Sequence, residues 1–166
     1  MPSKRTPAAK IALGGVLAAL AVVIMSMGTL IPVATYVCPM ICIVIGQMVL
    51  KSCGIRIAWA WYGAVAILSL LLAPDKEGAA VFLFIGYYPI VKPRLDRSRG
   101  KWLWKALLFN TSILIMYALL MNLLGMEQIA RDFSEMGAVM TAVMLILGNV
   151  TFFLLDRLLG MRPKRK

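Results

Sequence analysis

Few side chains in this sequence could carry chemistry. The chain has no histidine, three cysteines and seven acidic residues. Cys38 and Cys42 have the spacing to share one face of a helix, but a zinc site needs further ligands, so we expect small apolar thiols and no metal. There is no Walker lysine loop, no nucleophile motif and no carboxylate pair within an apolar stretch. We therefore expect a protein that is not an enzyme and uses no cofactor.

Neutral polar side chains recur inside the apolar stretches. They are Gln47, Asn110, Thr111, Ser112, Asn122, Thr141, Asn149 and Thr151. A polar group surrounded by hydrocarbon must find a partner, because leaving it unpaired costs several kcal/mol. Two interpretations are open. The groups pair with one another between helices, or some of them line a small pocket for a neutral or zwitterionic ligand.

The hydrophobic composition predicts the type of secondary structure that positions these polar side chains. Of the 166 residues, 61% are hydrophobic and only 15% are charged, and the mean hydropathy is +0.86. The apolar residues come in long blocks, which require lipid as the solvent. We expect an all-α, polytopic membrane protein, a bundle of six transmembrane helices that forms a single domain over residues 1–166.

Six spans are predicted from the lengths of the apolar blocks. Their approximate ranges are 8–31, 34–50, 55–73, 79–91, 102–124 and 136–159. The first is too long for the apolar core of a cleaved signal, so we expect it to be retained as a span. The fourth is short and carries Pro89 near its end, so whether it crosses the bilayer fully is open.

The placement of the basic residues predicts the orientation. If the N-terminus is cytoplasmic and six spans follow, 16 of the 18 basic residues lie in cytoplasmic segments, and only Lys76 and Arg131 lie outside. Short loops follow this positive-inside asymmetry. We therefore expect both termini in the cytoplasm and a location in a bacterial plasma membrane. The net charge of +11 is then explained by topology and contact with membrane lipid, so no nucleic-acid partner is expected.

Small residues on the first span are spaced to form a helix-packing face. They occur as the pairs Ala8 with Ala12, Gly14 with Ala18, and Gly15 with Ala19. Such spacing lets another helix approach closely. The neighbouring helix could belong to this chain or to a partner protein, and both interpretations are open.

The whole chain resembles the S-components of energy-coupling-factor transporters, in its six short spans, its orientation and the small residues of its first span. In that family, small residues of span one dock onto a transmembrane coupling subunit driven by two ATPases. The resemblance implies this docking role for Gly14, Gly15, Ala18 and Ala19. It also implies that a small-molecule ligand binds from outside, with Asn122, Glu127, Thr141 and Glu77 as candidate contacts. The chain would then be the substrate-binding component of an ATP-driven importer for a vitamin-like ligand or other small metabolite.

An alternative of another class is a membrane scaffold or assembly subunit that does not transport. It would use the span-one residues and the basic loops to hold a partner membrane protein, without any ligand. Small molecules that co-purify with the protein would distinguish the importer component from the scaffold.

Overall fold

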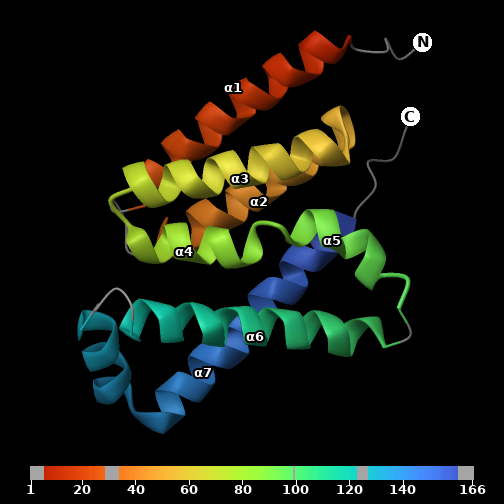
Figure 1. Ribbon diagram of the computed structural model, residues 1–166. Coiled ribbons are helices and arrows are strands. Elements are labelled where there is room, and N and C mark those ends of the chain that lie inside the picture. Colours follow the sequence, from red (N-terminus) through yellow and green to blue (C-terminus); the bar gives the residue numbers. More distant parts are fainter. Residues whose placement is uncertain (1–5, 29–33, 99, 123–126, 161–166) are drawn as a thin grey trace. The chain divides into compact units, whose positions relative to one another are not determined.

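Every regular element that the computed structural model describes is a helix (Figure 1). It describes residues 6–28, 34–98, 100–122 and 127–160, and for 121–122, 127–141 and 144 it describes the backbone alone. The chain divides into a first unit, Met1–Arg97, and a second unit, Ser98–Lys166. The first unit holds α1 Pro7–Ser26, α2 Ala34–Cys53, α3 Ile55–Leu72, α4 Lys76–Ile85 and α5 Tyr88–Leu95; the second holds α6 Lys101–Asn122 and α7 Glu127–Gly160.

Four of these helices are long and apolar enough to cross a membrane. They are α1, α2, α3 and α6, and they overlap the predicted spans 8–31, 34–50, 55–73 and 102–124, of which 29–31 and 123–124 lie outside the described residues. The prediction of an all-helical fold is confirmed for the described residues, and four of their helices have the length and composition of membrane spans. The count of six spans, the orientation and the single domain stay predictions.

The other two predicted spans differ from the helices observed. The range 79–91 is divided between α4 and α5, which break at Gly86 and Tyr87 and have 10 and 8 residues. Pro89 accounts for the break, because it lacks an N–H and is favoured in the first turn of a new helix. The range 136–159 lies inside α7, which begins at Glu127 and has 34 residues, so residues 127–135, which precede the predicted sixth span, are helical as well.

In the first unit, α1 and α4 lie on opposite sides of α2 and α3 (Figure 1). Thr6 caps the start of α1, because its side chain accepts a hydrogen bond from the Ala9 N–H at 3.3 Å, and Pro7 follows in the first turn. A single residue, Gly54, joins α2 to α3. Its φ of +95° lies in the region that other residues rarely adopt, so glycine allows the two helices to reverse direction directly.

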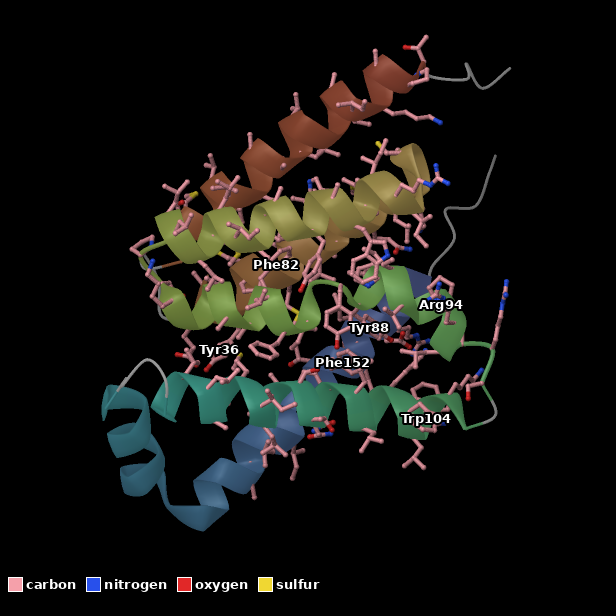
Figure 2. The ribbon with its side chains drawn as sticks, in the orientation of Figure 1. Tyr36, Phe82, Tyr88, Arg94, Trp104 and Phe152 are labelled. Atoms are coloured by element: carbon pink, nitrogen blue, oxygen red, sulfur yellow. The ribbon has the colours of Figure 1, made fainter. Side chains whose placement is uncertain are left out.

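The core of the first unit is aromatic. Phe82 of α4 is fully buried and points toward α3 (Figure 2). Its ring packs edge-on against Trp61 at a centroid distance of 6.2 Å and lies 6.0 Å from the ring of Tyr62. The Tyr62 hydroxyl donates a hydrogen bond to the Leu83 carbonyl oxygen. Paired rings and a satisfied hydroxyl fix the short α4 against α3.

In the second unit, α6 and α7 form an antiparallel pair. The rings of Phe109 and Phe152 stack at 4.7 Å, and those of Trp102 and Phe153 lie 5.2 Å apart. Phe152 is fully buried and points toward α6 (Figure 2). A methyl group at Gly148 would lie 3.5 Å from the Phe109 ring, in ordinary van der Waals contact, so the ring packs directly beside this glycine. These contacts set the register in which the polar pairs described below meet.

Candidate functional site

The first helix has an inward face that packs on its own chain. Gly14, Ala21 and Met25 are buried, and Ala18 is half-buried. A methyl group at Gly14 would lie 3.3 Å from the Ile57 Cγ2 of α3. The Cys42 thiol of α2 donates to the Ala21 carbonyl oxygen at 3.4 Å. Of the predicted docking residues, Gly14 therefore packs within the first unit, and the docking role of the half-buried Ala18 stays a prediction.

A different face of α1 is open. Ala8, Ala12, Gly15 and Ala19 are all exposed, and their spacings of four, three and four residues place them on one face. A Cβ added at Gly15 would meet nothing within 4 Å. Small residues on an exposed helix face let the backbone of another helix approach closely, which is how helices associate in lipid. We call these four residues the α1 small-residue face.

An acidic cluster joins the end of α3 to the start of α4. The Asp75 side chain caps α4 by accepting from the Gly78 N–H at 3.0 Å. Lys76 points back and donates to the carbonyl oxygens of Leu70 and Ala73 at 2.8 and 2.9 Å, which caps the end of α3. The second carboxylate oxygen of Asp75 is buried and has no hydrogen-bond partner in the part of the chain described here. The two caps hold this cluster in a fixed geometry.

Glu77, a predicted ligand contact, belongs to this cluster. Its Oε1 accepts a hydrogen bond of 2.9 Å from the Tyr36 hydroxyl of α2, and the contact is exposed. The structure thus ties Glu77 to a neighbouring helix and leaves it within reach of solvent. Its role as a ligand contact stays a prediction.

The other three predicted ligand contacts lie in the second unit. Asn122 is the last residue of α6 and Glu127 the first of α7, so both flank the connection between these helices; Thr141 lies further along α7. Their side chains fall outside the described part of the structure. Their ligand role therefore also stays a prediction.

A charged pair, which the sequence analysis missed, lies between α6 and α7. The Lys105 ammonium donates to both carboxylate oxygens of Asp156, at 3.0 and 2.9 Å. The two side chains are only 5% and 9% exposed. Lys105 also lies 5.9 Å from the centre of the Trp102 ring. Because each charge is neutralised by the other, this pair is a structural clamp between the helices.

Two amides form a closed pair nearby. Asn110 donates to Asn149 Oδ1 at 3.0 Å, and Asn149 donates back to Asn110 Oδ1 at 3.1 Å. Each amide also donates at 2.8 Å to a carbonyl oxygen in its own helix, that of Ala106 or Leu145. Both N–H groups of both amides are used. Of the two interpretations of the polar residues, helix pairing holds for these two.

This amide pair supports a first prediction. The substitution Asn149→Leu should lower the free energy of unfolding in detergent by about 1 kcal/mol, because it strands donors and acceptors of Asn110 between the helices. The double variant with Asn110→Leu should lose less than the sum of the two single losses. Thr151→Val is the control, since Thr151 is exposed and donates only to Leu147 in its own helix. Strictly additive losses would show that the two amides do not interact.

The cysteines fit their predicted apolar role. Cys38, Cys42 and Cys53 are all buried and free. Within the residues that the structure describes, no group of three or more histidine, cysteine or acidic side chains could hold a metal ion.

The described part of the chain is all-helical, and four of its helices are candidates to span a membrane. Comparison with protein-family models, with curated proteins and with solved structures gives no match.

Proposed function

We propose that this chain is the membrane-embedded, substrate-binding component of an ATP-driven importer, with ATP hydrolysis on separate subunits. Its ligand is a small vitamin-like molecule or other small metabolite. The chain crosses a bacterial plasma membrane six times with both termini in the cytoplasm, and the broken pair α4 and α5 forms the fourth crossing. The support for the orientation is the distribution of charge, with 16 of 18 basic residues on one side under this topology.

The observation that carries the proposal is the α1 small-residue face. α1 uses one face, with Gly14, to pack on α3, and this leaves Gly15 and its neighbours uncovered. Contact with lipid does not require small residues, because lipid tails solvate large apolar side chains equally well. A second helix does benefit from them, because small residues let the two backbones come into close van der Waals contact. We therefore expect a partner helix to pack on this face. Such packing would be the contact by which a substrate-binding component docks on a coupling subunit.

The ligand would bind at the end of the first unit that carries Asp75 and Glu77. Under the proposed topology this end faces outward, together with the segments that hold Asn122 and Glu127. The carboxylates of Asp75 and of the half-buried Glu77 give this end negative charge. Such a site favours a cationic or zwitterionic ligand.

The docking step supports a second prediction. The double substitution Gly15→Leu with Ala19→Leu should reduce the amount of coupling subunit and ATPases that co-purifies with the chain by about tenfold or more, because the added side chains hold the partner helix away. Gly63→Leu in α3 is the control, since a Cβ there also meets nothing within 4 Å. The double variant should fold and melt as the parent does. Undiminished recovery of the partner would contradict docking through this face.

The scaffold alternative is favoured by one observation in the second unit. Its described polar residues between α6 and α7 satisfy one another, as Lys105 with Asp156 and Asn110 with Asn149, and this suits a purely structural role. Purification separates the two functions. The importer component should co-purify with ATPase subunits and melt at a higher temperature with its ligand. A ligand-free chain bound to a membrane partner without ATPases would establish the scaffold instead.

A further inference from the structure

A cleft opens at the end of the first unit that is farther from Asp75. It has a volume of about 460 Å³ and lies between the start of α1 and the turn from α2 to α3. Its walls are mostly apolar, with Pro7 and Ile11 on one side and Ile55 and Ile57 on the other. The lining also includes two cationic residues, Lys10 and Arg56, and the turn residues Cys53 and Gly54.

The position of the two cations is set by the fold. The Cys53 thiol donates to the Lys10 carbonyl oxygen at 3.3 Å, which ties the first turn of α1 to the end of α2. Gly54 then starts α3 at once, so Arg56 lies in the first turn of α3. Gly54 provides no side-chain cap, so the free N–H groups at the start of α3 add positive potential beside Arg56.

No counter-charge comes from the neighbouring sequence. The first acidic residue of the chain is Asp75, so α1, α2 and α3 contain none. Asp75 and Glu77 follow the far end of α3, which has 18 residues and is therefore about 27 Å long. Asp96 pairs with Lys92, and Asp156 pairs with Lys105. Among the residues that the structure describes, neither Lys10 nor Arg56 has an acidic partner.

We propose that this cleft binds an anionic phospholipid. The phosphate lies between Lys10 and Arg56, and an acyl chain follows the apolar wall formed by Ile11 and Ile57. Both cations lie at the ends of helices that can span a membrane, which is the depth of the lipid headgroups. The apolar walls favour a lipid over free phosphate, because a small anion would leave them in water. This inference does not depend on the importer function.

The test compares lipids and variants of the purified full-length chain. Native mass spectrometry in neutral detergent would count the lipids that the protein retains, with phosphatidylglycerol and phosphatidylcholine offered at equal concentration. The parent should prefer phosphatidylglycerol by about tenfold, since each surface cation contributes to the attraction. The double variant Lys10→Gln with Arg56→Gln should lose this preference.

Matched variants distinguish lipid binding in the cleft from general attraction to surface cations and from an effect of misfolding. Lys51→Gln with Arg94→Gln removes two exposed cations that do not line the cleft, and it should keep the preference. Lys10→Arg with Arg56→Lys keeps the charge and should keep it as well. Millimolar inorganic phosphate should not displace the lipid.

Three results would overturn the proposal. They are an equal preference in the parent and the Gln double variant, an equal loss in the Lys51 and Arg94 control, and displacement of the lipid by free phosphate. The last result would assign the cleft to a small anion.

Discussion

Replacement of Asp156 by alanine is expected to lower the free energy of unfolding by about 3–5 kcal/mol, the largest loss among the single substitutions considered. The reason is the partner that remains. Lys105 is 5% exposed and has Asp156 across the helix pair, so removal of the carboxylate leaves an ammonium group buried without its counter-charge. Reversible unfolding of the purified chain in mixed detergent micelles would measure the loss.

The control for this prediction is the neighbouring residue. Arg157→Ala removes an exposed charge from the same helix turn and should cost less than about 0.5 kcal/mol. The double variant Lys105→Met with Asp156→Leu should recover most of the stability, because two apolar side chains of similar size need no counter-charge. The clamp is refuted if Asp156→Ala costs no more than Arg157→Ala, or if the double variant is as unstable as the two single losses added together.

The second large effect is expected where α2 crosses α3. Gly46 of α2 faces the Trp61 ring so closely that a methyl group there would lie 2.9 Å from Trp61 Cζ3. The Trp61 ring is itself held edge-on by Phe82 of α4, so it has little room to move. Gly46→Leu should therefore separate the helices and lower the free energy of unfolding by about 3 kcal/mol. Thermal melting in detergent would show the loss as a lower midpoint.

Gly63→Leu is the matched control for this substitution. It makes the same chemical change inside a helix, but a Cβ at Gly63 would meet nothing within 4 Å. Both substitutions gain about 1 kcal/mol of helix propensity, so any difference between them reports the packing alone. Equal melting temperatures for the two variants would show that α2 and α3 do not pack closely at Gly46.

The helices of this fold could be predicted from the sequence where a local pattern, such as a long apolar block, determines the helix. Long apolar blocks predict α1, α2, α3 and α6, because a helix of about 20 apolar residues satisfies its own backbone hydrogen bonds in lipid. The break at Gly86 and Tyr87 was harder to place. Pro89 is compatible with the end of a helix or with the first turn of a new one, and the structure shows it in the first turn of α5.

The charged pair in the second unit shows a limit of reasoning from charge alone. Lys105 was assigned to the basic inner segment with the other cations, because lysines near span ends follow topology. Its true setting depends on the register of α6 against α7, which the stacking of Phe109 on Phe152 fixes. Asp156, an acidic residue near the inner end of the last predicted span, was the signal that could have indicated a partner for Lys105.

The small residues of α1 could be identified from the sequence. Which of their two faces stays exposed in the fold could not. Spacing alone places Gly14 with Ala18 and Gly15 with Ala19 on two faces of one helix, and nothing local distinguishes them. The close approach of Ile57 to Gly14 makes the distinction, because it shows that the face with Gly14 packs within the chain. The second pair stays exposed, and the proposed docking rests on it.

The most direct test of the central proposal is photo-cross-linking inside the native membrane. A short diazirine side chain would replace Val16, which is 67% exposed beside the α1 small-residue face, or Leu71 of α3, which is 71% exposed. If a partner helix docks on this face, the probe at Val16 forms an adduct with the coupling subunit that co-purifies with the ATPases, and the probe at Leu71 labels lipid. Lipid adducts alone from both positions would contradict the proposal.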